Sequence, residues 1–221
     1  MPEEILEKLF DSAVKVRLLK LFMRNENSVF TLNEIKDRIQ LEGPGVHHAL
    51  DNLREIGFLH VVARKKKNAK SVVKTTGKGK KGKKIKIEIT SREKFFSLNP
   101  SFVFYNELRN LVLKSSPASK KRIAERIKRL GRVKMAVLSG IFLKPERENL
   151  HTDIFIVGDD MSEKKVANFI RALEADVGTE LLYSVLSSDE YFYRTKMFDR
   201  FLLDIFENPH EKIINRFKEQ V

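Results

Sequence analysis

The highest concentration of functional side chains in the sequence is a run of basic residues. Between positions 64 and 86 there are twelve Lys and Arg residues and no Asp or Glu. The whole chain has a net charge of +13, so twelve of these charges lie in this run and the other residues contribute only +1. Ammonium and guanidinium groups at this density bind polyanions, because each neutralised phosphate releases condensed counterions. The run predicts a nucleic-acid partner; a solvated lysine loop without a dedicated partner is the alternative.

A second set of polar side chains shares one face of a predicted helix over 44–57. Pro44 suits the first turn, Gly57 suits the C-terminal stop, and apolar residues from Val46 to Ile56 recur at helical spacing. The opposite face carries side chains that can approach base edges or phosphates: Gly45, His47, His48, Asn52 and Arg54. No metal site is expected here, because neighbouring histidines on a helix point about 100° apart. The alternative is an ordinary solvated surface.

The elements around these residues predict how they are positioned. Thr31 and Glu34 form a capping-box pattern that begins a short helix, and Gln40 to Gly43 is the turn before the next helix. Strands are predicted at 58–63 and 85–90, with a lysine-rich loop between them and a further short strand at 95–98. Two helices joined by a tight turn and followed by a β-ribbon are typical of a winged helix-turn-helix.

This arrangement predicts a division of labour on duplex DNA. The 44–57 helix would enter the major groove and supply specificity, and the basic wing over 64–86 would contact phosphates and supply affinity. RNA is the alternative partner, although its deep major groove is closed to side chains. The predicted phosphate contacts are Arg64, Lys65, Lys66, Lys67, Lys70, Lys74, Lys78, Lys80, Lys81, Lys83 and Lys84.

Length and composition predict a two-domain intracellular protein. A chain of 221 residues with 42% hydrophobic content can bury two modest cores. It has no cysteine, no pattern of a secretory signal and no apolar run long enough to span a bilayer, so we expect a cytoplasmic, nucleoid-associated protein without a membrane partner. The expected domains are a winged helix at 1–99, an apolar linker helix at 100–116 and a second domain at 117–221.

The second domain is predicted to be α/β. Apolar runs at 133–138, 153–157 and 180–186 predict strands, interleaved with helices that begin near Ser162 and Ser188. Terminal helical segments are predicted at 198–206 and 213–217. A helix over 118–130 carries a basic face, either a second phosphate-contacting surface or a solvated one. The whole fold is thus expected to be α+β or α/β, with a mixed sheet in the second domain.

Two segments of this domain resemble minimal nucleotidyltransferases: LSGIFLK at 138–144 and DIFIVGD at 153–159. The first hundred residues resemble the winged helices fused to such domains in bacterial and archaeal regulators. In active members a Gly-Ser pair cradles the triphosphate and two Asp residues hold Mg²⁺. Here Gly140 matches the glycine, but Ile141 replaces the serine and His151 replaces the first Asp, so that only Asp153 remains. The resemblance therefore implies a degenerate transferase site, because one carboxylate and a softer imidazole bind Mg²⁺ poorly.

Together these features predict a DNA-binding transcriptional regulator that is not an enzyme, with no cofactor and no metal. The transferase-like domain would serve dimerisation or sensing. The alternatives are an active nucleotidyltransferase of the antitoxin type and an RNA-associated module. A homodimer is expected because winged-helix regulators commonly bind paired half-sites, and the apolar stretch from Phe102 to Leu113 is the expected interface.

Overall fold

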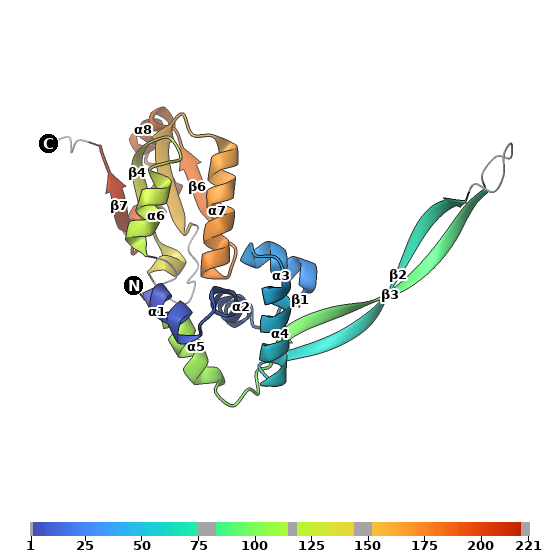
Figure 1. The fold of residues 1–221 in the computed structure, drawn as a ribbon. Coiled ribbons are helices and arrows are strands. Elements are labelled where there is room, and N and C mark those ends of the chain that lie inside the picture. Colours follow the sequence, from blue (N-terminus) through green and yellow to red (C-terminus); the bar gives the residue numbers. More distant parts are fainter. Residues whose placement is uncertain (1, 75–82, 115–118, 144–151, 218–221) are drawn as a thin grey trace.

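A computed structural model describes residues 2–74, 83–114, 119–143 and 152–217 of the chain, and side chains for 5–62, 93–113, 119–143 and 152–217. The described part is a mixed α and β structure with two small sheets (Figure 1). Its elements are α1 (Pro2–Leu9), α2 (Ala13–Arg24), β1 (Val29–Thr31), α3 (Leu32–Ile39), α4 (Pro44–Glu55), β2 (Leu59–Lys74), β3 (Lys83–Leu98), α5 (Tyr105–Lys114), α6 (Lys120–Ile127), β4 (Arg132–Leu138), the 3-10 helix η1 (Gly140–Phe142), β5 (Ile154–Asp159), α7 (Glu163–Val177), β6 (Tyr183–Leu186), α8 (Ser188–Lys196), α9 (Arg200–Glu207) and β7 (Glu211–Asn215).

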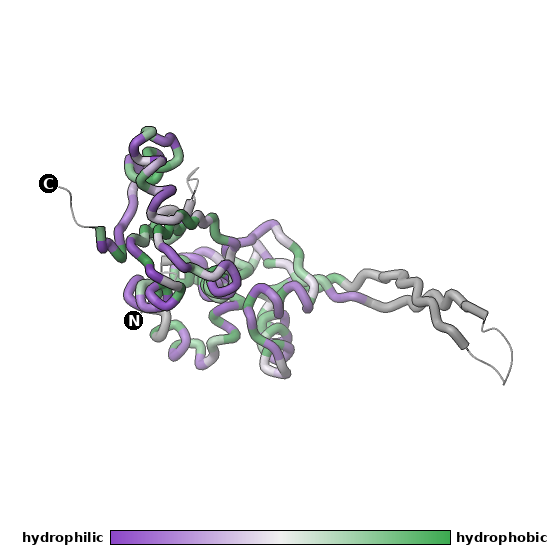
Figure 2. The backbone as a smooth tube through the Cα atoms, turned by 90° about the horizontal axis from the view of Figure 1, so that it is seen from above, coloured by the Kyte–Doolittle hydropathy of each residue, from purple (hydrophilic) through white to green (hydrophobic). Residues whose placement is uncertain are grey.

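The N-terminal helices begin where their capping residues predict. The Ser12 hydroxyl accepts a hydrogen bond from the backbone N–H of Lys15 and begins α2. At α3 the predicted capping box is confirmed, since Thr31 and Glu34 exchange side-chain and backbone hydrogen bonds. Pro44 is the first residue of α4, as predicted. In Figure 2 hydrophilic and hydrophobic colours alternate along these helices, as expected of helices with one buried face.

These helices share one core with the first sheet, which has the order β1-β3-β2. Buried residues of α2, α3, α4 and the base of the ribbon form a single cluster, with Phe22, Ile35, Val46 and Phe58 completely or almost completely inaccessible. The last turn of α5 belongs to the same cluster through Val112 and Leu113. The predicted apolar helix therefore packs on the N-terminal core along α2.

The β-ribbon is longer than predicted. Strands β2 and β3 have sixteen residues each and pair antiparallel from Leu59↔Leu98 to Lys74↔Lys83. The predicted third strand at 95–98 is the base of β3, and the segment predicted as a lysine loop is mostly strand. Figure 1 shows the two strands extending away from the body of the molecule. The third strand of this sheet is β1, which the sequence did not predict; it pairs with Phe95 to Ser97.

The second sheet has the order β6-β5-β4-β7 and is covered on both faces. Its strands are antiparallel except for the parallel pair β5 and β6. Helices α6 and α7 pack their apolar faces, around Ile127 and Leu173, on one side. Helix α9 packs Leu202 and Ile205 on the other. The predicted strands at 133–138 and 153–157 are confirmed as β4 and β5 to within two residues.

Three other predictions were wrong. The segment 213–217 was predicted as helix, but 211–215 is strand β7, because it pairs with the free edge of β4. Strand β6 begins at Tyr183, three residues later than predicted, because Leu181 and Leu182 use their N–H groups on side-chain carboxylates. Ile56 was predicted to face the core but is 60% exposed, and α4 ends at Glu55, two residues before the predicted end. No helix in the described ranges is long and apolar enough to cross a membrane.

Candidate functional site

Helix α4 presents a polar face that the rest of the molecule leaves open. Its buried side is made by Val46, Ala49, Leu50 and Leu53, all at most 5% exposed. On the other side Gly45, His47, His48 and Arg54 are exposed, and Asn52 is partly exposed. No atom lies within 4 Å of the position that a Cβ on Gly45 would occupy, so packing does not require glycine there. The structure thus places all five predicted residues of this helix at or near the surface.

One ion pair restrains this face. A guanidinium nitrogen of Arg54 lies 3.6 Å from a carboxylate oxygen of Asp51, and both side chains are about half exposed. Such surface pairs contribute at most about 1 kcal/mol, so Arg54 can exchange Asp51 for another anion. The imidazoles of His47 and His48 can donate or accept hydrogen bonds, and the Asn52 amide can do both at once.

A groove separates α4 from the base of the β-ribbon. It has a volume of about 390 Å³ and is lined by residues of α3, α4 and β3. His47 of α4 and Lys94 of β3 both line it, and Asp51 and Glu93 add acidic groups to its wall. The groove therefore connects the polar face of α4 with the ribbon, so that one bound partner could contact both.

The ribbon carries most of the charge of the chain on two paired strands. Nine of the twelve basic residues between 64 and 86 belong to β2 or β3. Lys78, Lys80 and Lys81 lie outside the described residues. Sixteen residues of strand span about 50 Å. The basic residues are therefore spread along an extended ribbon instead of being gathered in one loop, as the sequence had suggested.

The segments that resemble a transferase site meet in the second half of the molecule. Gly140 and Ile141 begin η1, and the Asp153 carboxylate accepts a hydrogen bond from the Ile141 N–H at 3.1 Å. Its second oxygen accepts the Leu182 N–H at 2.9 Å. Asp153 is only 1% exposed. His151 lies outside the described residues.

This geometry directs the carboxylate toward the backbone and away from solvent. Asp153 joins the end of β4, through η1, to the chain segment that precedes β6. Among the described residues there is no group of three or more His, Cys, Asp or Glu side chains that could hold a metal ion. The arrangement suits a structural carboxylate better than a ligand of Mg²⁺, which requires accessible converging oxygens.

A cluster that the sequence did not predict lies where the two halves of the chain meet. Asp176 at the end of α7 forms ion pairs with Arg17 of α2 at 2.7 Å and with Arg126 of α6 at 3.3 Å. The buried Lys20 donates from Nζ to the backbone carbonyl of Asp176 at 2.9 Å. Arg126 is therefore occupied within the molecule, although the sequence placed it on an exposed basic face of its helix.

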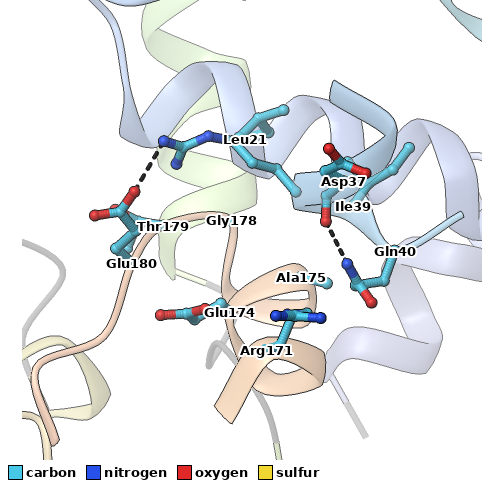
Figure 3. A pocket seen from close by; sticks show the side chains of 11 residues that line it. Leu21, Asp37, Ile39, Gln40, Arg171, Glu174, Ala175, Gly178, Thr179 and Glu180 are labelled. Atoms are coloured by element: carbon cyan, nitrogen blue, oxygen red, sulfur yellow. Dashed lines mark hydrogen bonds and ion pairs between the residues drawn. The ribbon is translucent and has the colours of Figure 1, made fainter. Parts of the chain in front are cut away.

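The same junction contains a pocket of about 480 Å³ between α3 and the end of α7. Arg38 and Glu180, which both line this pocket, form an ion pair of 2.9 Å. Figure 3 shows Glu180 at one side of the pocket, with a dashed line that marks this pair. Arg171 and Glu174 of α7 lie opposite Gln40, the residue that follows α3. Residues more than a hundred positions apart make this pocket, and no local pattern in the sequence indicates it.

Comparison with protein-family models and with curated sequences gives no further guidance to this site. No protein-family model matches the chain, and no curated protein sequence matches it. The functional argument therefore depends on the side chains themselves. The feature with the clearest chemical meaning is the polar face of α4 beside the basic ribbon.

Proposed function

We propose that this protein is a DNA-binding regulator whose N-terminal half is a winged helix-turn-helix. The observation that carries the proposal is the open polar face of α4, which shares a groove with the base of a ribbon that carries most of the net charge. The element order α2-β1-α3-α4-β2-β3 supports it, since two helices joined by a short turn precede a β-ribbon. Such a role would keep the protein at the nucleoid.

In this proposal α4 enters the major groove of duplex DNA. Its diameter fits the groove, and its polar side faces outward while its apolar side stays in the core. His47, His48 and Asn52 then reach base edges, and Arg54 reaches a base or a phosphate. Gly45, without a side chain, allows the start of the helix to approach the sugar-phosphate backbone closely.

The ribbon then acts as an elongated phosphate clamp. Lysines contact phosphates as point charges and do not distinguish base sequence. A span of about 50 Å exceeds one helical turn of B-DNA, which is about 34 Å long. The ribbon could therefore follow the DNA backbone beyond the site that α4 occupies. Affinity would come mainly from the ribbon and specificity from α4.

We further propose that the second half of the chain is a nucleotidyltransferase-like domain without catalytic activity. The two hydrogen bonds that the Asp153 carboxylate accepts from backbone N–H groups support this, because they occupy the single remaining acid. This second half contacts α2 and α3 through the ion pairs Arg17–Asp176 and Arg38–Glu180. These contacts suit a role in sensing or transmitting a signal, because α3 leads directly into α4.

The decisive experiment is equilibrium binding to mixed-sequence duplex DNA and to duplex RNA over a range of salt concentrations. The test variant replaces Lys65, Lys66 and Lys67 in the ribbon by Gln. A control variant replaces Lys8, Lys164 and Lys165, which are exposed on α1 and α7, by Gln and so removes the same charge elsewhere.

We expect tight DNA binding. The logarithm of the association constant should fall steeply as the logarithm of the salt concentration rises. The ribbon variant should reduce this slope by about 2 to 3, because each lost phosphate contact contributes about 0.9. The control variant should bind like the wild type. If both variants bind DNA equally weakly, the ribbon contributes only through the net charge of the protein and not through its own phosphate contacts. If the protein binds RNA more tightly than DNA, the partner is RNA.

A further inference from the structure

Helix α8 is unusual among the described helices of the second half because none of its side chains is buried. Tyr193 is 66% exposed and Met197, one turn further along, is 64% exposed. Phe198 follows directly and is 79% exposed. We call these three residues the α8 patch. Large apolar side chains that adjoin one another on a surface commonly mark a site of protein contact.

The chain holds Phe198 in a fixed outward position. Its φ angle is +50°, a left-handed conformation that side chains other than glycine and asparagine rarely adopt. The Phe198 N–H donates to the Thr195 carbonyl, and the next residue, Asp199, caps α9 through the N–H groups of Phe201 and Leu202. The end of α8 and the start of α9 thus determine the backbone here. An aromatic ring presented in this way loses little freedom on binding.

The charges of α8 are arranged so that two antiparallel copies of this helix would place opposite charges near each other. Asp189 and Glu190 lie in its first turn, and Arg194 and Lys196 lie in its last turn. Two copies of α8 packed antiparallel about a two-fold axis at Tyr193 would bring Asp189 of each copy toward Lys196 of the other, because both residues lie on the same flank of the helix. Glu190 is already paired with Arg194 of its own helix at 2.6 Å. A parallel arrangement would instead place like charges together.

We infer that the α8 patch is the contact surface between two copies of this chain, packed antiparallel about a two-fold axis through Tyr193. The balanced charges of α8 fit a second copy better than they fit a nucleic acid, which would require a basic surface. Figure 1 shows α8 on the far side of the body from the β2–β3 ribbon, so pairing through α8 leaves both ribbons accessible. The inference does not depend on DNA binding, because the contact forms without it.

Another exposed apolar surface offers a competing interface that can be tested directly. Phe104 is 63% exposed and lies just before α5, in the segment from which the sequence predicted dimerisation. Near it, Arg109 already pairs with Glu26 at 2.9 Å.

The test measures the molar mass of the full chain by sedimentation equilibrium, without DNA, over a range of micromolar concentrations. We expect a reversible dimer. Tyr193→Lys should raise the dissociation constant by at least about tenfold, as expected for a central aromatic contact. Phe104→Lys, an equivalent change at an equally exposed ring, should leave it unchanged. Far-UV circular dichroism of both variants verifies that they are folded.

A charge-reversal pair makes the two-fold geometry itself testable. Asp189→Lys and Lys196→Glu should each weaken the dimer, and the double variant should restore it, because the opposed charges are exchanged together. A wild-type monomer at every concentration would overturn the inference, as would loss of the dimer in Phe104→Lys but not in Tyr193→Lys. A double variant weaker than both single variants would overturn the antiparallel arrangement. None of these outcomes bears on DNA affinity.

Discussion

The carboxylate of Asp153 occupies the space that a side chain at position 140 would need. An ideal Cβ built on Gly140 would overlap the Oδ1 atom of Asp153, the same oxygen that accepts the Ile141 N–H. Gly140 also has a φ angle of +51°, in the left-handed region. A glycine and a buried acid that could belong to a phosphate-binding site thus make a compact structural contact with each other.

This contact predicts that both residues stabilise the second half of the chain. Gly140→Ala should destabilise the fold by more than the roughly 1 kcal/mol expected for the backbone conformation alone, because the methyl group also displaces the carboxylate. Asp153→Asn should cost about 2 to 3 kcal/mol, since one of its two backbone donors would then face an amide NH₂. Urea unfolding followed by circular dichroism measures both effects.

Thermal unfolding with and without ligands separates the structural role of Asp153 from a catalytic one. If Asp153 only supports the fold, Mg²⁺ and a nucleoside triphosphate should leave the melting temperature of the wild-type protein unchanged, because a ligand stabilises only the state that binds it. A clear rise in melting temperature that disappears in Asp153→Asn would contradict this and favour the transferase.

The two halves are expected to be energetically coupled through Asp176. Its carboxylate is mostly shielded from solvent and pairs with Arg17 and Arg126. A double-mutant cycle with Arg17→Gln and Asp176→Asn should give a coupling energy of about 1 kcal/mol. Asp176→Asn alone should cost more than Arg17→Gln, because it weakens both ion pairs.

The control for this prediction is an ion pair with similar geometry within one half. Lys128 and Glu125 lie 2.7 Å apart on the exposed side of α6, one turn from each other. Their cycle should give a coupling near zero to about 0.5 kcal/mol, the usual range for surface pairs on helices. Equal coupling energies in the two cycles would mean that the junction adds nothing to the stability of the fold.

Helix α5 is attached to the N-terminal half by a contact that should depend on pH at both extremes. Burial alone would raise the pKa of Glu26, but the hydrogen bonds from Tyr105 and Arg109 outweigh it and leave this pKa below its ordinary value of 4.5. Burial and the Glu26 carboxylate raise the pKa of Tyr105 from 10.0 to about 12.

The direction of each shift gives the pH window. The contribution of Glu26 is complete above pH 4.5 and is lost as the pH falls through its lowered pKa. The contribution of Tyr105 is complete below pH 10.0 and is lost as the pH rises through about 12. Thermal unfolding across this range should show Glu26→Gln losing acid sensitivity and Tyr105→Phe losing alkaline sensitivity. A Tyr105→Phe profile identical to that of the wild type at high pH would contradict the assignment.

Much of the fold could be predicted because its helices have local signals. Ser12, the Thr31–Glu34 box and Pro44 fix helix starts through contacts within a few residues, so the sequence alone contains the information. Short edge strands lack such signals. Strand β1 has three residues and β7 has five, and each forms because the edge of a sheet is available to pair with it.

The candidate site divides in the same way. The outward face of α4 follows from helical periodicity, and the polar residues predicted there are exposed or partly so. The length of the ribbon could not be predicted from the sequence, because the lysine and glycine residues in 64–84 are typical of a loop. In the structure Val72 and Ile85 nevertheless lie opposite each other on paired strands. The junction around Asp176 and its pocket were not predictable, since they join α2 and α3 to a helix more than a hundred residues away.

The proposed division between α4 and the ribbon predicts a separation of specificity from affinity. Asn52→Ala removes an amide that can form two hydrogen bonds with an adenine, and should reduce discrimination between the best DNA site and mixed sequence by about 1 to 3 kcal/mol. Binding to mixed sequence should barely change. The best site is obtained by selection from random duplexes, and both affinities are measured at one fixed salt concentration.

The matched control is Glu55→Ala on the same helix, an exposed residue at its C-terminal end that the proposal assigns no base contact. Discrimination should survive this change because the central polar face of α4 remains intact. If Asn52→Ala and a variant lacking His47 and His48 both retain full discrimination, then α4 does not contact base edges. The polar face would then be a solvated surface beside a ribbon that binds DNA without regard to sequence.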